Sequence, residues 1–152
     1  MLKHLAVYGW IVLCLFAATP PRALSQGTKQ AGTIEVRVNY TGSGKVDQTH
    51  PIYVSLWNSA AFVEEGSREM PIQTKPVHSR NGTAIFNHVT GNHAYVSAVY
   101  DPSGKWKAMS APPAGSSLGL YANSDGKPER VTLTSEKKTA IELKLDDSFK
   151  SQ

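Results

Sequence analysis

The chain has 152 residues, a formal net charge of +4 and one cysteine, Cys14. Its basic residues are scattered along the sequence, whereas nucleic-acid binding requires a clustered basic face, so the composition argues against that partner. A lone cysteine excludes an intramolecular disulfide, and the length is sufficient for one compact core without such cross-links.

The first 25 residues have the features of a cleavable export signal. An apolar stretch at 5–18 follows a short polar start, and the small residues Ala23 and Ser25 occupy the two positions that signal peptidase reads. We predict cleavage between Ser25 and Gln26, which makes the product secreted or periplasmic, without a thiol and without a membrane anchor. An uncleaved anchor is the alternative, but crossing a bilayer needs about 20 apolar residues and this stretch is shorter.

After the signal, the sequence predicts one folded domain with short flanking segments. We expect a flexible leader at 26–31, a domain at 32–148 and a frayed C-terminal tail at 149–152. Clusters of Gly, Pro, Asn and Asp divide the domain into short runs, because these residues adopt the backbone angles that turns require. Only the segment 59–65 is compatible with a brief helical turn.

Within these runs, apolar and polar residues alternate with period two, which is typical of strands that bury one face and expose the other. The apolar positions are Ile34, Val36, Val38 and Tyr40; Ile52, Val54 and Leu56; Ala94, Val96, Ala98 and Tyr100; Val131 and Leu133; and Ile141, Leu143 and Leu145. About seven short strands without long helices predict an all-β fold, an antiparallel β-sandwich of two sheets packed face to face.

One segment matches a catalytic motif. Residues 115–119 have the pattern G-x-S-x-G, in which Ser117 would be a nucleophile at a sharp strand-to-helix turn. That chemistry also needs a histidine later in the chain, and none follows Ser117. We therefore favour a Gly/Ser-rich loop, expect no catalytic residue, and keep a small serine hydrolase as the least favoured alternative.

The sequence offers weak candidates for metal ligands. The histidines of the exported chain lack the i, i+4 helical spacing of zinc enzymes. Calcium needs several oxygen ligands on one turn, whereas Asp101 is soon followed by Lys105, and Asp146 and Asp147 end a strand with diverging side chains. We therefore expect no metal ion and no cofactor. The histidines are His50, His78, His88 and His93.

Three aromatic residues are the candidates for ligand binding: Trp57, Trp106 and Tyr121. Flat rings with a polar tip suit sugar faces and peptide partners. Trp57 lies on the strand face opposite the apolar positions, and Trp106 lies beside a turn, a poor place for a core residue. The alternative is that Trp57 and Tyr121 pack beneath the long loops as additional core, and for Trp106 both interpretations stay open.

The order of these segments resembles the carboxypeptidase regulatory-like and prealbumin-like (transthyretin-like) sandwiches, including small secreted bacterial proteins of unassigned function. The resemblance rests on the segments at 32–36 and 51–57, the G-x-A-x-F motif at 82–86, and the tyrosine-valine strand at 94–101. It implies an Ig-like or prealbumin-like topology and a non-enzymatic binding or structural domain. Some relatives carry an Asp/Asn-rich loop after that strand, but Pro102 interrupts it here, so no metal role is carried over.

Together, these observations predict an exported, non-enzymatic β-sandwich module for binding or scaffolding. The expected ligand is a glycan or an envelope or extracellular protein. An alternative is a structural protein that assembles by pairing an open edge strand with another chain.

Overall fold

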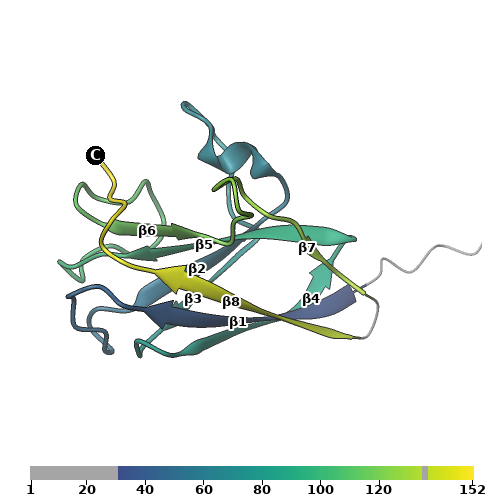
Figure 1. The fold of residues 1–152 in the computed structure, drawn as a ribbon, viewed down its shortest axis with the longest axis horizontal. Helices are drawn as coiled ribbons and strands as arrows, with labels where there is room; N and C mark the ends of the chain where they lie inside the picture. The colour runs from purple at the N-terminus through teal and green to yellow at the C-terminus, as the bar shows by residue number, and fades with distance from the viewer. Residues whose placement is uncertain (1–30, 135–136) are drawn as a thin grey trace, which may run out of the picture.

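The computed structural model describes residues 31–134 and 137–152, and these residues form an all-β sandwich (Figure 1), as the sequence predicts. The predicted export signal, its cleavage site and all but the last residue of the predicted leader lie outside the described residues. Within the described part, no helix has the length and apolar character needed to cross a membrane.

The described chain contains eight strands and one short 3-10 helix, η1 (Ala60–Val63), which lies where the sequence allowed a brief helical turn. In chain order, the strands are β1 (Ala31–Tyr40), β2 (Ile52–Trp57), β3 (Gln73–Val77), β4 (Thr83–Thr90), β5 (His93–Tyr100), β6 (Ser117–Leu120), β7 (Val131–Thr132) and β8 (Lys138–Leu145).

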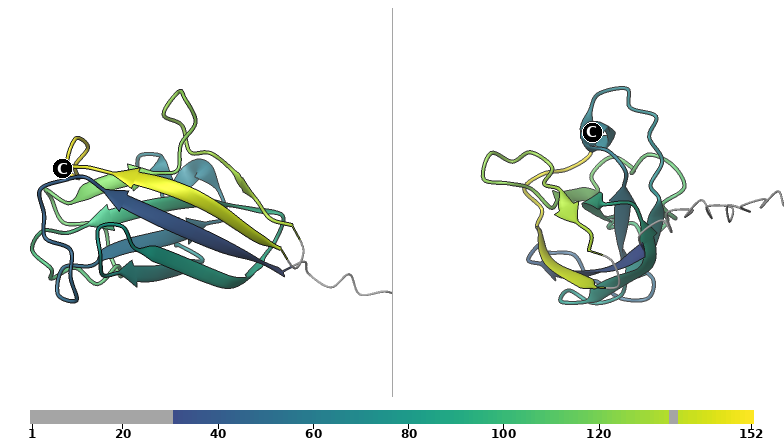
Figure 2. Two further views of the ribbon diagram at one scale, coloured as in Figure 1. Left: turned by 60° about the horizontal axis from the view of Figure 1, so that its bottom comes forward. Right: turned by 90° about the vertical axis from the view of Figure 1, so that its right-hand side faces the viewer.

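The strands form a three-stranded sheet in the order β4-β1-β8 and a five-stranded sheet in the order β3-β2-β5-β6, with β7 also paired to β5. All pairings are antiparallel except that of β1 with β8, which is parallel (Figure 2). This parallel pair aligns Val36 with Ile141. The expected antiparallel arrangement therefore holds for every pair but one. β8 can lie parallel to β1 because the two strands are far apart in the sequence and no tight hairpin joins them.

The core lies between the two sheets, and the predicted alternation is confirmed there. The apolar positions predicted from the alternation are buried, except Ile141, which is only partly buried. Phe86 of β4, the largest of the fully buried side chains, joins them. Burial of these side chains is the main stabilisation of the fold, because removing apolar surface from water contributes about 25 cal/mol per Å².

β5 departs from the expected alternation, because its outward-facing side chains are also buried. Tyr95, Ser97 and Val99 point away from the core and yet have little solvent exposure. Two long connections fold over this outer face: loop 58–72, between β2 and β3, and loop 101–116, between β5 and β6. The period-two pattern did not predict this burial, because loops rather than solvent cover the outer face of the sheet at β5.

Two strands lie where the sequence pattern is weak. β3 contains Pro76, and it forms an edge of the five-stranded sheet, where a missing N–H is tolerated. β6 begins at Ser117, so the G-x-S-x-G segment enters a strand rather than a helix. The predicted tail pairs with this strand: Leu118 N–H donates to Phe149 O at 2.9 Å, and Ser151 N–H donates to Ser116 O at 2.9 Å.

The two sheets are joined at one end by the carboxylate of Asp147, just after β8. The Tyr40 and Ser117 hydroxyls donate to its Oδ1, each at 2.8 Å, and the backbone N–H and hydroxyl of Ser43 donate to its Oδ2, each at 2.8 Å. The Ser43 N–H, aided by these three hydroxyls, outweighs desolvation and holds the pKa of Asp147 well below its usual range. Burial, followed by the bond to Asp147, raises the pKa of Tyr40 to about 12.

Beside this cluster, Gly44 passes very close to the packed pair Tyr40 and Tyr100, whose ring centroids are 4.9 Å apart. A Cβ at position 44 would overlap the Tyr100 ring. We expect Gly44→Ala to lower the free energy of unfolding by about 2 kcal/mol, the cost of overpacking a core. Urea unfolding measures this, and the exposed loop change Gln48→Ala, which we expect to be neutral, is the control. Equal stabilities of the two variants would contradict the prediction.

Candidate functional site

The main concave site is a groove on the outer face of the five-stranded sheet, with a volume of about 420 Å³. Loop 58–72 and loop 101–116 both line it, and side chains of β2 and β5 form its floor. Figure 1 shows η1 and its loop standing above the sheet at this place. Because Trp57, Phe62 and Trp106 all line this space, we call it the aromatic groove.

Trp57 ends β2 and reaches the groove because residues of a strand alternate between the two faces of the sheet. Its indole N–H donates to Ser97 Oγ of the neighbouring β5 at 2.9 Å. Its ring stacks on Phe62 of η1, with centroids 4.6 Å apart and planes only 8° from parallel. One face of the indole is therefore already covered, and the ring fixes loop 58–72 to the sheet.

Trp106 forms part of the opposite wall. Its ring meets Tyr53 edge to face, with centroids 5.2 Å apart at an interplanar angle of 86°. Its indole N–H donates to Ser110 O within the same loop at 3.1 Å. The indole is thus held in place by two contacts and is only partly buried.

Asp101 holds the turn that carries Trp106. It is 4% exposed, and its carboxylate accepts the backbone N–H groups of Ser103, Lys105 and Trp106 at 2.8, 3.1 and 2.9 Å. The Ser103 hydroxyl donates to it as well, at 2.7 Å. Burial alone would raise the pKa of Asp101, but these four hydrogen bonds outweigh burial and hold the pKa below its usual value. From the sequence, Asp101 was a weak candidate for a calcium ligand. In the structure, its carboxylate caps a turn.

Two exposed methionines line the groove, one from each loop. Met70 is 74% exposed and Met109 is 85% exposed. Sequence reasoning missed both, together with Phe62. Methionine is flexible and polarizable, so it is suited to contact apolar partners of varied shape. The sequence feature that could have pointed to the two methionines is their position in proline-containing loops, next to Pro71 and near Pro112.

The third predicted ring does not belong to this site. Tyr121 is partly buried, packs against the main core and does not line the groove. Its N–H donates to Val96 O at 3.0 Å, and its carbonyl accepts from Glu129 N–H at 2.8 Å. The structure therefore brings Trp57 and Trp106 together and places Tyr121 in the role of additional core.

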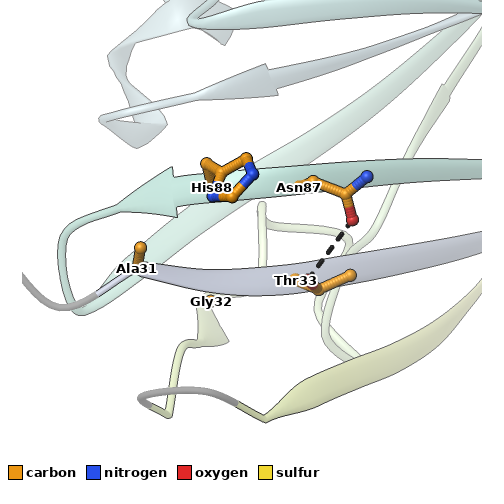
Figure 3. Close-up of a pocket in the computed structure, with 5 residues that line it drawn as sticks. All are labelled: Ala31, Gly32, Thr33, Asn87 and His88. Atoms are coloured by element: carbon orange, nitrogen blue, oxygen red, sulfur yellow. Dashed lines mark hydrogen bonds between the residues drawn. The ribbon is translucent and has the colours of Figure 1, made fainter.

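A second hollow lies where β1 begins beside the end of β4 (Figure 3). It has a volume of about 240 Å³ and is lined by backbone and small side chains, with Asn87 and His88 at one wall. The Thr33 hydroxyl donates to Asn87 Oδ1 at 3.4 Å, so the side-chain oxygen of Asn87 already has a hydrogen-bond partner. No Phe, Tyr or Trp side chain lines it, and the aromatic groove is the stronger candidate.

The catalytic and metal alternatives can be compared with the geometry. Ser117 is 1% exposed, and its hydroxyl proton is directed to Asp147 Oδ1 at 2.8 Å, which suits a structural hydrogen bond better than a nucleophile open to substrate. Among the described residues, no group of three His, Cys, Asp or Glu side chains is arranged to hold a metal ion.

The fold and the site define an all-β sandwich whose most developed surface feature is an aromatic, methionine-lined groove. No protein-family model, curated protein or solved structure matches the chain. Membership of the carboxypeptidase regulatory-like or prealbumin-like families therefore stays a prediction from the sequence motifs.

Proposed function

We propose that this chain is an exported, non-enzymatic binding module and that the aromatic groove receives an apolar segment of a protein. One observation carries the proposal: both tryptophans of the described chain and two highly exposed methionines gather around one cavity. Apolar side chains scattered singly over a surface are ordinary, whereas a cluster of them marks an interaction site, so this clustering supports an interaction surface.

A glycan is the second ligand class that the sequence raised, and the details of the groove favour it less. Sugar recognition uses an open ring face together with free hydrogen-bonding groups. Here Phe62 covers one face of Trp57, and the indole N–H groups of Trp57 and Trp106 already donate within the chain. The Ser55 hydroxyl on the floor is likewise paired, with Thr74 at 2.8 Å.

Assembly through an open strand edge is the structural alternative, and features of three of the four strands at the sheet edges discourage it. β3 carries Pro76 on its edge, and the tail at 149–151 pairs with β6. β4 contains an irregularity opposite 32–34, where His88 has a positive φ of 55°. Prolines, bulges and covering segments are the means by which proteins protect sheet edges.

The experiment is a binding panel of glycans and envelope proteins, read by intrinsic tryptophan fluorescence, since Trp57 and Trp106 both line the groove. We expect Trp106→Ala to weaken binding of the recognised protein at least about tenfold, as removal of a central aromatic anchor does. Phe149→Ala, which removes an exposed ring outside the groove, is the matched control and should bind normally.

Tyr121→Ala tests the third predicted ring in the same panel. Because Tyr121 packs on the core, we expect lower stability and unchanged affinity at temperatures where the variant is folded. Unchanged binding by Trp106→Ala would show that the groove is not the binding site. Selective binding of a glycan rather than a protein would replace the proposed ligand class.

A further inference from the structure

The fourth edge strand, β8, pairs with β1 on one side only. The Thr41 N–H donates to Leu145 O at 2.9 Å, so the odd-numbered residues of β8 direct their backbone groups toward β1. This direction alternates along a strand, so the even-numbered residues direct their N–H and C=O groups away from the sheet. In the first half of the strand, these outward residues are Lys138, Ala140 and Glu142.

Within the part of the chain that the structure describes, no backbone group pairs with the outward groups of these three residues. Such an unpaired row of N–H and C=O groups is a template for an added strand. Farther along β8 the edge is closed by β6, because a Cβ at Gly119 would lie 3.2 Å from Lys144 O. The segment available for pairing is therefore 138–142, which we call the open edge.

The core-facing side chains of the open edge are incompletely covered. Leu143 and Leu145 in the second half of β8 are buried, whereas Thr139 and Ile141 are only partly buried. Ile141 is also the exception among the core positions predicted from the alternation. A strand added along the open edge would place its own side chains beside these two and cover them further.

The outward side chains of the open edge carry one charge of each sign. A lysine on an edge strand usually discourages pairing. The Lys138 ammonium, however, is directed back over the sheet to Glu35 Oε2 of β1, at 2.6 Å, rather than across the edge. Glu142 forms no ion pair with any described residue, and the small side chain of Ala140 lies between the two charges. An added strand must therefore offer an acid opposite Lys138 and a base opposite Glu142.

The open edge of a second copy meets this requirement. In a two-fold antiparallel pairing centred on Ala140, Lys138 of each copy lies opposite Glu142 of the other. The outward backbone groups of the two copies then face one another, so each of the three opposed pairs exchanges two N–H···O=C hydrogen bonds. On the core side, Thr139 of each copy lies opposite Ile141 of the other.

Charge disfavours the neighbouring two-fold registers. A centre on Ile141 opposes Lys138 with Lys144, and a centre on Glu142 opposes two glutamates. Like charges directly opposite each other destabilise a strand pair. The strand is therefore complementary to itself in the register centred on Ala140.

We infer that the open edge is a dimerisation site, at which β8 pairs antiparallel with β8 of a second copy about a two-fold axis at Ala140. The two three-stranded sheets then form one continuous sheet in the order β4-β1-β8-β8-β1-β4. Because the paired strands are antiparallel and only their first halves are used, the two C-terminal tails lead away in opposite directions. This surface is separate from the aromatic groove, so the dimer does not depend on the proposed function.

A cross-link tests the register directly. The predicted exported product has no cysteine, so Ala140→Cys introduces its only thiol. Opposed residues of a hydrogen-bonded antiparallel pair have Cα atoms about 5.5 Å apart, a separation that a disulfide spans. On mild oxidation, we expect this variant to run as a covalent dimer on a non-reducing gel. Lys144→Cys, exposed on the same strand, is the matched control and should stay monomeric on that gel, because its two thiols would be about 27 Å apart.

Sedimentation velocity over a concentration series, on protein purified from cells that express the full chain, measures the association. The unaltered protein should dimerise. Ala140→Pro removes an outward N–H that β1 does not use, so we expect the fold to persist, as circular dichroism would show. Its dimer should dissociate at least about tenfold more readily, because the central pair loses its hydrogen bonds. Ala140→Thr keeps the N–H and should dimerise normally.

A charge reversal tests the same contact without changing the backbone. Glu142→Lys places two lysines opposite each other twice in the dimer, and we expect dissociation to be about tenfold easier. Glu64→Lys makes the same change of net charge in the exposed part of loop 58–72 and should leave the dimer intact.

A protein that is monomeric throughout the series, or a dimer that neither Ala140→Pro nor Glu142→Lys weakens, would overturn the inference. Equal cross-linking of the cysteines at positions 140 and 144 would also overturn it. Panel binding that is lost on Ala140→Pro, without self-association, would assign the open edge to a strand of another protein. The proposed function has a separate readout, since Trp106→Ala changes the groove and leaves the open edge unaltered.

Discussion

Replacing Asp147 by alanine is expected to lower the free energy of unfolding by about 3 kcal/mol, because hydrogen bonds to a charged group are worth about 1.5–3 kcal/mol and their buried donors lose a partner. The carboxylate accepts from Tyr40 of β1 and from Ser117 of β6, and therefore joins the two sheets. It also accepts twice from Ser43, which fixes the loop after β1. Two of the donors, the Tyr40 and Ser117 hydroxyls, belong to side chains that are almost completely buried.

Urea unfolding followed by circular dichroism measures the loss. Asp146→Ala is the matched control, because this neighbouring carboxylate is exposed and bonds only to Ser148 in its own turn. We expect the control to cost less than about 1 kcal/mol. Similar losses for the two variants would show that Asp147 does not join the sheets energetically.

The same carboxylate should make stability depend on pH on the acid side. An unfolded aspartate has a pKa of about 3.9, and the folded-state pKa of Asp147 is lower. The unfolded chain therefore binds the proton first, so the contribution of Asp147 is fully present above about pH 5 and is lost as the pH falls toward the folded pKa. The stability difference between the unaltered protein and Asp147→Asn should shrink over that range. A difference that grows on acidification would contradict this assignment.

The sandwich was predictable because alternation reports directly on burial between two sheets. Ile34, Val36 and Val38 are buried as expected, since each strand has one face on the core. The parallel pairing of β1 with β8 was not predictable, because the pattern of apolar residues is the same for either direction of a strand. The burial of the outward-facing side chains of β5 was not predictable either, because it depends on where loops that are distant in the sequence lie.

The candidate site was predictable only in part. Trp57 and Trp106 were identified from ring chemistry and local position, and the structure brings them to one groove. Tyr121 had the same ring chemistry and yet packs on the core, because side-chain type does not determine which face a residue near the end of a short edge strand presents. Met70 and Met109 carry no motif, and their role depends on the convergence of two loops that are far apart in sequence.

Asp101→Ala is expected to lower the affinity of the aromatic groove for its protein partner about 30-fold, although Asp101 itself does not line the groove. Its carboxylate holds three backbone N–H groups of the turn that carries Trp106. Without it, the wall must be ordered on binding, and a cost of about 2 kcal/mol corresponds to about 30-fold in affinity. Asp101 is therefore a positioning residue for Trp106.

A readout on the indole separates positioning from general destabilisation. With Trp57 replaced by phenylalanine, fluorescence of the exported product reports on Trp106, because the predicted cleavage removes Trp10. Asp101→Ala should increase quenching of this fluorescence by acrylamide. Asp125→Ala, an exposed aspartate in another turn, should leave quenching and binding unchanged. Asp101→Asn keeps one acceptor oxygen and should fall between the two. If binding is lost while quenching is unchanged, Asp101 does not act by positioning Trp106. A turn that no longer holds Trp106 must expose its indole to the quencher.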